Sequence, residues 1–288
     1  MKKIGVLGAN GMAGHVIFTY FTEKGYDTYG IAKGSKNNDN MTDIDVLDKL
    51  KLNEWLDKNN FDVIINCIGI LNQVAENNID LAIYLNSYLP HYLETKYKNT
   101  NTKIIHMSTD CVFSGNEGKY KEDSFKDGDT FYDRTKALGE IVNNKDLTFR
   151  MSIIGPDFNP KSIGLFNWFM SQTGNISGYN KVFWTGVTTI ELAHAMEEAI
   201  KQNLSGLYHL VPNCSISKYD LITLFKKVFN RSDITISENF EKESNKSLIR
   251  TRNDFNFVVS DYEKMVFEMK KWIQDHFDIY KDIYNKIN

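Results

Sequence analysis

The sequence predicts an α/β fold in which a doubly wound parallel sheet is followed by a smaller C-terminal lobe. Three observations predict it. Apolar strands alternate with helical patterns over residues 1–155. A glycine-rich turn, Gly8-x-x-Gly11-x-x-Gly14, joins the first strand to the first helix. The run Phe61–Cys67 is almost continuously apolar, which is typical of a parallel strand that helices cover on both faces.

The elements of the sheet domain follow from the spacing of apolar residues, because short apolar runs predict strands and apolar residues at helical spacing predict helices. In chain order, we expect strand Ile4–Leu7, helix Met12–Lys24, strand Thr28–Ala32, helix Val46–Lys58, strand Phe61–Cys67, helix Ile79–Tyr97, strand Lys103–Met107, helix Asp129–Asn143 and strand Leu147–Ile154. Pro90 lies inside the longest helix and predicts a kink there, since proline has no backbone N–H to donate.

The alternation loosens after Gly155-Pro156. We expect, in order, helix Gly164–Ser171, a polar loop over Thr173–Tyr179, amphipathic helix Thr189–Lys201, strand Gly206–Val211, helix Ser217–Phe229, a polar surface segment over Glu238–Asn256 and helix Asp261–His276. Residues 1–155 are therefore predicted to form the first domain, with 182–212 returning to it. Residues 156–181 and 213–288 are predicted to form the lobe.

The composition narrows the classes of function. The 288 residues carry a net charge of −3, so there is no basic footprint for nucleic acid. No apolar run reaches the roughly 18 residues that a membrane span needs. Cys67, Cys111 and Cys214 have no paired spacing and the six histidines form no metal-binding motif, so neither disulfides nor a metal site are expected. We expect a protein of the reducing cytoplasm.

The glycine turn predicts a dinucleotide-binding site of the Rossmann type. Its glycines let the backbone approach a pyrophosphate, and the following helix offers unpaired N–H groups at the positive end of its dipole. The alternative interpretation is a tight turn without a ligand. Ile68-Gly69 follows the third predicted strand at the carboxyl edge of the sheet, where ligands of such folds bind. The predicted cofactor contacts here are Gly8, Asn10, Gly11, Met12, Cys67, Ile68 and Gly69.

The end of the second strand determines which nicotinamide cofactor is expected. Sites for NAD usually place an acid about 20 residues after the glycine motif, where it binds the ribose 2′-hydroxyl. Residues 31–36 read Ile-Ala-Lys-Gly-Ser-Lys and contain no acid. Lys33, Ser35 and Lys36 suit a 2′-phosphate instead, although surface lysines are commonly only solvated. We expect NADPH, with NADH as the alternative, and Asp45-Val46 as a candidate adenine contact.

Tyr132 and Lys136 are the predicted catalytic pair and are also expected to contact the cofactor. They are four residues apart on a helix, so both side chains lie on one face. The ammonium is expected to lower the pKa of the phenol, which passes a proton to a carbonyl oxygen as hydride arrives. Thr109 is expected to polarise that carbonyl, with Ser108 as the fallback hydroxyl. The spacing recurs at other tyrosines, but only Tyr132 lies in the helix that follows a strand ending in Ser108-Thr109-Asp110.

Five stretches of the chain carry a family resemblance. They are Gly-Ala-Asn-Gly-Met-Ala-Gly at 8–14, Val-Ile-Ile-Asn-Cys-Ile-Gly at 63–69, Ser-Thr-Asp-Cys-Val-Phe-Ser-Gly at 108–115, Tyr-Asp-Arg-Thr-Lys-Ala-Leu-Gly-Glu at 132–140 and Ser-Lys-Tyr-Asp-Leu at 217–221. They resemble the extended short-chain dehydrogenase/reductases and, within them, the dTDP-4-dehydrorhamnose reductase-like family. Leu7, Asp133 and Met151 depart from the usual residues of that family.

The resemblance implies an NADPH-dependent enzyme that reduces the 4-keto group of a nucleotide-diphospho-6-deoxy-sugar for deoxy-sugar and polysaccharide biosynthesis. It implies the roles given above for Thr109, Tyr132 and Lys136, and it implies that Asn86 supports the lysine through water. A homodimer is a family-level expectation. The C-terminal lobe would bind the substrate.

Candidate substrate contacts are Ser108, Asp110, Trp184 and Arg250, and position alone adds Lys161, Phe166, Trp168, Lys246 and Arg252. Three other functions are alternatives for the same residues. A 4,6-dehydratase usually has Glu after Thr-Asp, where this chain has Cys111, which argues against that reaction. A sugar epimerase, which uses the same Tyr/Lys pair, stays open. So does a non-catalytic NADP-binding subunit similar to that of methionine adenosyltransferase.

Overall fold

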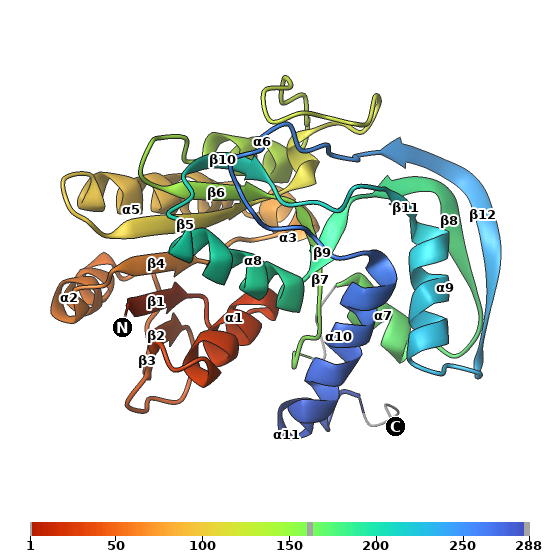
Figure 1. Cartoon of the computed structure of the whole chain (residues 1–288), viewed down its shortest axis with the longest axis horizontal. Coiled ribbons are helices and arrows are strands. Elements are labelled where there is room, and N and C mark those ends of the chain that lie inside the picture. The colour runs from red at the N-terminus through yellow and green to blue at the C-terminus, as the bar shows by residue number, and fades with distance from the viewer. Residues whose placement is uncertain (1, 160–163, 285–288) are drawn as a thin grey trace. The chain divides into compact units, whose positions relative to one another are not determined.

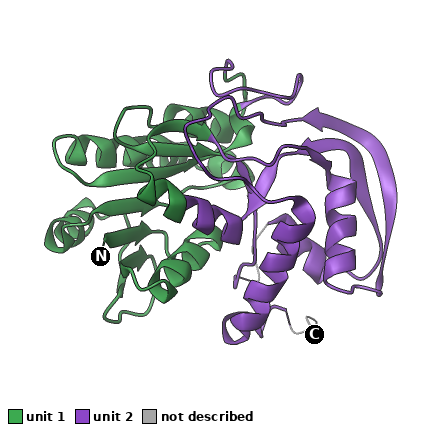
Figure 2. Ribbon diagram, in the orientation of Figure 1, with its two compact units in different colours: residues 1–112, 126–150, 197–208 green, residues 113–125, 151–196, 209–288 purple. Residues whose placement is uncertain are grey.

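The structure is a computed structural model that describes residues 2–159 and 164–284, and the chain divides into two compact units (Figure 2). Unit 1 comprises Met1–Val112, Lys126–Arg150 and Glu197–Tyr208. Unit 2 comprises Phe113–Phe125, Met151–Met196 and His209–Asn288.

The units differ from the expected domains in two places. Residues 113–125 group with unit 2, where the Tyr120 N–H donates to the Ser247 carbonyl at 2.9 Å. The segment that returns to unit 1 is 197–208, which is shorter than the expected 182–212. Both differences arise from contacts between segments far apart in the chain, which local patterns do not report.

Unit 1 is built on a seven-stranded sheet (Figure 1) with the order β10-β6-β5-β4-β1-β2-β3. Its strands are β1 Lys3–Leu7, β2 Asp27–Ala32, β3 Met41–Asp43, β4 Val63–Asn66, β5 Lys103–Ser108, β6 Leu147–Arg150 and β10 Gly206–His209. β1 pairs in parallel with β2 on one side and with β4 on the other. The strand order therefore reverses at β1, and the predicted α/β fold with a doubly wound parallel sheet is confirmed.

Helices cover this sheet because their apolar residues recur at helical spacing. In unit 1 they are α1 Met12–Glu23, α2 Lys49–Asn59, α3 Asn72–Asn77, α4 Ile79–Ala82, the π-helix η1 Ile83–Tyr88, α5 Leu89–Tyr97, the 3-10 helix η2 Asp110–Val112, α6 Phe131–Leu138 and the last turns of α8 Thr189–Lys201. Leu52 and Leu56 of α2 and Leu89 and Leu93 of α5 join the strand residue Ile64 in one core cluster. Figure 1 shows α1 on the other side of the sheet from α5.

The long helix expected over Ile79–Tyr97 contains a π-helical segment in place of a simple proline kink. The Leu89 N–H donates to the Tyr84 carbonyl, five residues back. Pro90 falls in the first turn of α5 and has no N–H to give to the carbonyl of Asn86. The change of hydrogen-bonding pattern therefore occurs just before the proline, and π segments of this kind are frequent at functional sites.

Three further expectations about elements of unit 1 differ from the structure. The strand expected over Leu147–Ile154 is two strands, because β7 Ser152–Ile154 leaves the seven-stranded sheet and pairs with β9 Gly186–Thr188. The helix expected over Asp129–Asn143 is the shorter α6, which ends at Leu138 and is followed by the C-cap residue Gly139. The three-residue strand β3 was not expected, since it is too short to carry a pattern.

Unit 2 contains a three-stranded sheet in the order β11-β8-β12. Its strands are β8 Gly174–Trp184, β11 Ile216–Ser217 and β12 Ile234–Asn245, and its main helices are α7 Leu165–Ser171, α9 Lys218–Val228 and α10 Tyr262–Asp275, followed by the short α11 Phe277–Tyr280. The prediction of a polar loop over Thr173–Tyr179 is wrong, because most of this segment belongs to β8. Much of β8 and β12 is exposed, so neither strand shows the apolar pattern by which strands are recognised.

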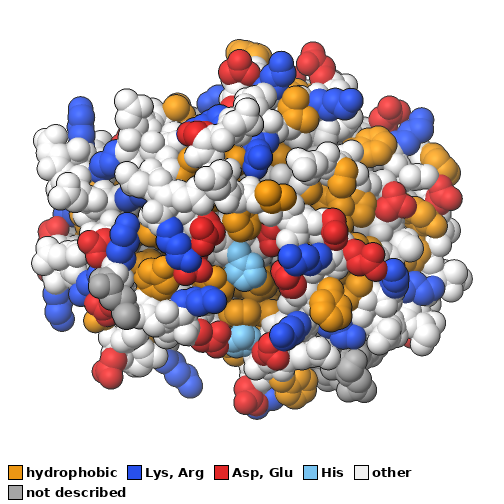
Figure 3. Space-filling view, viewed as in Figure 1, with side chains coloured by type: hydrophobic (Ala, Val, Ile, Leu, Met, Phe, Trp, Pro, Cys, Tyr) orange, Lys and Arg blue, Asp and Glu red, His pale blue; other side chains and the backbone are white. Residues whose placement is uncertain are grey.

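The distribution of charge on the surface agrees with the nearly balanced numbers of acidic and basic residues in the sequence. Figure 3 shows acidic and basic side chains interspersed over the face in view. Within residues 2–159 and 164–284, no helix is long and apolar enough to span a membrane.

Candidate active site

The glycine turn lies at the carboxyl end of β1, where the strand order of unit 1 reverses. Gly8 has a φ of +78°, a left-handed conformation that glycine adopts without strain. A Cβ added to Gly14 would lie only 2.0 Å from the Gly8 carbonyl oxygen, so the first turn of α1 packs directly on the loop. Gly11 caps α1 without a side-chain hydrogen bond. The Gly8 and Ala9 N–H groups donate to the Ile31 carbonyl and the Gly11 N–H donates to the Gly8 carbonyl, so the donors that suit a pyrophosphate are those of the uncapped first turn of α1.

A second loop, after β4, adjoins the first. A Cβ on Gly8 would lie 2.9 Å from the Ile68 side chain and 3.4 Å from the backbone of Cys67. Asn86 of η1 holds the residue after Gly69, because its side chain accepts from the Ile70 N–H at 3.0 Å and donates to the Ile70 carbonyl at 3.1 Å. The structure therefore brings together the predicted cofactor contacts Gly8, Asn10, Gly11, Met12, Cys67, Ile68 and Gly69 along two adjoining loops.

The three predicted catalytic side chains also lie in unit 1. The Tyr132 and Thr109 side chains are hydrogen-bonded to each other. Lys136 Nζ donates to the Met107 carbonyl at 2.6 Å, and a Cβ on Gly69 would lie 4.0 Å from the same nitrogen. All three residues are buried. Strand β5 with its following turn and helix α6 thus place a phenol, a hydroxyl and an ammonium beside the loop after β4.

Burial dominates the electrostatics of Tyr132 and Lys136. It raises the pKa of Tyr132 above the ordinary value for a phenol, and the hydrogen bond with Thr109 opposes that rise. The Lys136 ammonium is not among the leading causes, so the expected lowering of this pKa is not seen. Burial lowers the pKa of Lys136 to about 8, with the Glu140 charge opposing it. Burial likewise raises the pKa of the Cys67 thiol to about 12.

Asn86 also contacts the helix that carries Lys136, and its expected support of Lys136 through water stays a prediction. Besides its two bonds to Ile70, its amide donates to the Thr135 hydroxyl at 3.2 Å. Asn86 therefore ties the loop after β4 to the helix that carries Tyr132 and Lys136.

Ser108, the fallback hydroxyl, belongs to a buried ionic network. It donates to Glu140 Oε1 at 2.6 Å, and Arg150 donates to both oxygens of the same carboxylate at 2.7 Å. Lys126 approaches Glu140 Oε2 at 3.1 Å. Burial pushes the pKa of Glu140 upward, but the Arg150 hydrogen bond and charge hold it below its usual value. The network joins the end of β5 to the segment after α6. The Ser108 hydroxyl therefore has a structural partner in Glu140.

Asp133, one of the departures from the family pattern, caps the catalytic helix. The Thr130 side chain accepts from the Asp133 N–H at 3.0 Å, and the Asp133 carboxylate accepts from the Thr130 N–H at 3.4 Å. This is a capping box, and the Thr-x-x-Asp spacing at 130–133 was the available sequence signal for it. Glu76 of α3 accepts from the Tyr132 N–H at 3.1 Å, and no sequence signal pointed to that contact.

The lysine predicted to bind a 2′-phosphate is held by an acid in this structure. Lys33 lies just after β2, and its ammonium is 2.9 Å from Asp45 Oδ2. Ser35 donates to the Ala32 carbonyl at 2.9 Å. Asp45, the candidate adenine contact, therefore lies beside the predicted phosphate site.

The remaining substrate candidates lie in unit 2, except Asp110, which accepts from the Thr109 hydroxyl at 3.2 Å. Trp184 is 2 % exposed and packs against Tyr262, and Phe166 is fully buried among aromatic rings, so neither offers a free face for stacking. Arg250 donates to the Phe257 carbonyl at 3.0 Å. Trp168 is partly exposed, Lys246 is half-buried, Arg252 pairs with Asp254, and Lys161 lies outside the described residues.

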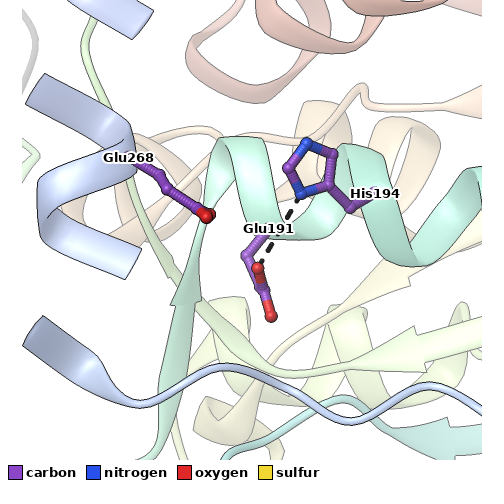
Figure 4. Close-up of side chains that lie close together, drawn as sticks. All are labelled: Glu191, His194 and Glu268. Atoms are coloured by element: carbon purple, nitrogen blue, oxygen red, sulfur yellow. Dashed lines mark ion pairs between the residues drawn. The ribbon is translucent and has the colours of Figure 1, made fainter. Parts of the chain in front are cut away.

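One group of side chains among the described residues has a composition that could hold a metal ion. Glu191 and His194 of α8 and Glu268 of α10 point toward one another (Figure 4), with ligand atoms within 4.8 Å. Glu191 already accepts from the Ser260 N–H at 2.6 Å, and its other oxygen is 3.9 Å from His194. Acidic groups gather in this way without a metal, and the expectation of no metal site stays a prediction.

A dinucleotide-type glycine loop at the switch point, with Thr109, Tyr132 and Lys136 beside it, defines an extended short-chain dehydrogenase/reductase. The chain belongs to the family described as RmlD substrate binding domain, which matches residues 1–275. The resemblance stated from the sequence motifs is therefore confirmed.

Individual relatives span most of the chain. The probable low-salt glycan biosynthesis reductase Agl14 of Haloferax volcanii is 26% identical over 75% of this chain and 76% of its own length. Methionine adenosyltransferase 2 subunit beta of Xenopus laevis is 24% identical over 78% of this chain and 71% of its own length. The crystal structure of dTDP-4-dehydrorhamnose reductase from Bacillus anthracis in complex with NADP aligns with a TM-score of 0.79 and 17% identity, covering 95% of this chain and 99% of that one. That likeness identifies the fold.

Proposed function

We propose that this protein is an NADPH-dependent reductase that converts the 4-keto group of a nucleotide-diphospho-6-deoxy-sugar to a hydroxyl, for deoxy-sugar and polysaccharide biosynthesis. The observation that carries the proposal is the assembly of Thr109, Tyr132 and Lys136 beside the loop after β4. The glycan biosynthesis reductase among the relatives supports the same class of substrate.

The residues of unit 1 fit a nicotinamide dinucleotide. The uncapped first turn of α1 and the left-handed Gly8 suit its pyrophosphate, and Gly69, where a Cβ would lie 3.1 Å from Asn86 Oδ1, keeps the backbone beside Lys136 free of a side chain. When bound, the cofactor supplies a hydride to the carbonyl carbon. The use of NADP by a related reductase of the same fold supports NADPH, as does Lys33 near the expected 2′-position.

Each catalytic side chain has a separate task. Tyr132 gives its phenolic proton to the carbonyl oxygen, and its raised pKa keeps that proton in place at neutral pH. Thr109 orients the carbonyl by donating to the same oxygen, for which its hydroxyl proton turns away from Asp110 Oδ1, its acceptor at 3.2 Å. Lys136 offers a positive charge that stabilises the phenolate left behind, and water returns the proton to Tyr132.

A regulatory role without turnover is the second candidate, because methionine adenosyltransferase 2 subunit beta aligns over 78% of this chain. In that case the cofactor site would be kept while the catalytic set is idle. A sugar epimerase uses the same tyrosine and lysine but consumes no net NADPH.

The test follows NADPH oxidation by absorbance with a panel of dTDP- and UDP-4-keto-6-deoxy-sugars made in situ by a 4,6-dehydratase. The reductase proposal expects stoichiometric oxidation with at least one sugar, and oxidation at least about a hundredfold slower with the Tyr132→Phe variant. Conversion of a sugar without net oxidation would favour the epimerase. Tight NADPH binding with no conversion of any sugar would favour the regulatory subunit.

A further inference from the structure

Two acids and one lysine meet where β2 and β3 end. The strands are parallel, and Ala32 stands opposite Asp43 in the register, so their carboxyl ends share one edge of the sheet. Lys33 and Gly34 follow β2, while Asp45 follows β3 by two residues. The Lys33 ammonium lies 2.9 Å from Asp45 Oδ2. This edge lies about 20 residues after the glycine turn, where a Rossmann site meets the adenosine ribose.

The acid of this pair is anchored to the backbone, whereas the ammonium of the lysine is paired with the acid alone among the described residues. Asp45 Oδ1 accepts from the Leu47 N–H at 3.0 Å, and its side chain is 33% exposed. The Lys33 side chain is 78% exposed. Asp43 anchors the neighbouring backbone instead, since its carboxylate accepts from the Gly34 N–H at 2.7 Å. A phosphate that arrives at this edge must therefore share Lys33 with an acid whose other oxygen is bonded to the backbone.

The two nicotinamide cofactors respond to such a pair in opposite ways. NADPH carries a phosphate dianion on the ribose, which Lys33 attracts and Asp45 repels. NADH carries a hydroxyl at that position, and this hydroxyl can donate a hydrogen bond to a carboxylate. Lys33 therefore favours NADPH over NADH, whereas Asp45 favours NADH over NADPH.

We propose that Asp45 is a specificity-determining residue that limits the preference for NADPH by holding Lys33. The inference rests on the proposed function only in that the protein binds a nicotinamide dinucleotide. With both side chains present, the site binds NADPH more tightly than NADH by a modest factor. Asp45 is the residue that limits this ratio of the affinities for NADPH and NADH.

The variants separate the two contributions. Asp45→Asn keeps an oxygen that accepts from Leu47 but removes the charge, so Lys33 becomes fully available to the phosphate. Lys33→Ala leaves Asp45 uncompensated. Asp48→Asn is the matched control, because Asp48 forms a similar exposed pair with Lys51 at 3.3 Å and asparagine caps a helix as well as aspartate does. Asp43→Asn tests the neighbouring acid.

The measurement is the dissociation constant of NADPH and of NADH for the full-length protein, from fluorescence titration without any sugar. Asp45→Asn is expected to raise the preference for NADPH about three- to fivefold, the scale of a partly exposed ion pair. Lys33→Ala is expected to lower it about tenfold or more, because a charge-assisted bond to phosphate is lost. The double variant is expected to lie between the two.

Two results would overturn the inference alone: an unchanged preference in Asp45→Asn, or an equal change in Asp48→Asn or Asp43→Asn. A wild-type protein that binds neither cofactor would overturn the proposed function together with it. Binding of both cofactors without turnover of any sugar would contradict the proposed reductase function but not the role of Asp45. The dissociation constants of the variants would still test that role.

Discussion

Burial has opposite consequences for the two titratable groups of the catalytic set. It disfavours the charged form of each group, so it raises the pKa of Tyr132 and lowers the pKa of Lys136 to about 8. The phenol therefore keeps its proton over the whole working range. The ammonium, in contrast, is close to losing its proton near neutral pH.

We expect Tyr132→Phe to lower kcat by about 10²- to 10⁴-fold, the range of general acid catalysis. The affinity for NADPH should change little, because the ring and the helix that carries it are kept. Steady-state rates and NADPH titration of the same preparation measure both quantities. A variant that retained more than a tenth of the wild-type rate would exclude the tyrosine as proton donor.

The activity should fall as the pH rises through about 8, where Lys136 loses its charge. Its pKa in the folded protein is depressed, so the charged form exists below that value and disappears above it. Tyr132 cannot cause the fall, since its pKa is raised. The profile of kcat/KM for NADPH, which reports the free enzyme, measures the break. Lys136→Arg should remove the break if the variant is active, and a profile that stayed flat to about pH 10 would contradict the assignment.

At the scale of elements, the buried Glu140–Arg150 pair connects the active-site strand to the segment after α6. Both side chains are at most 2% exposed, and Ser108 adds a third contact from the end of β5. A pair of this kind determines geometry more than stability, but removing one partner leaves a buried charge.

Glu140→Gln should therefore lower the free energy of unfolding by about 3–5 kcal/mol. The variant should also reduce the loss of unfolding free energy that occurs as the pH falls into the acid range. The pKa of Glu140 is lowered by folding, so its contribution is present above the unfolded pKa and is lost as the pH falls below it. Urea unfolding at several pH values measures both effects. Glu198→Gln, in an exposed pair with Lys201, is the matched control and should change stability by less than about 1 kcal/mol.

At the scale of the whole molecule, stability is linked to cofactor binding, because the binding loops join β1, β4 and η1 in the core of unit 1. NADPH at about 100 times its dissociation constant should stabilise the folded state by about 2.7 kcal/mol. Thermal unfolding with and without NADPH measures this shift. Gly14→Ala, which forces a Cβ against the Gly8 carbonyl, should weaken or abolish it. An equal shift in that variant would place the cofactor elsewhere.

Much of the catalytic site was predictable because its residues occur in local motifs. Tyr132 and Lys136 share a helix face, and Thr109 directly follows β5, so short-range geometry sufficed to propose them as a catalytic set. The role of Ser108 was not predictable, since it depends on Glu140 and Arg150, which approach through the fold. The burial of Trp184 and Phe166 was missed for the same reason.

The sequence by itself determined the βα alternation, the parallel sheet and the family, because apolar periodicity and glycine turns act over a few residues. It also sufficed to propose the catalytic set. Only the tertiary structure decided where the chain divides into units, that β8 pairs with β12, and that Lys33 is held by Asp45. These features depend on backbone pairing and charge contacts between separate segments. Such contacts leave no periodic pattern in the segments that make them.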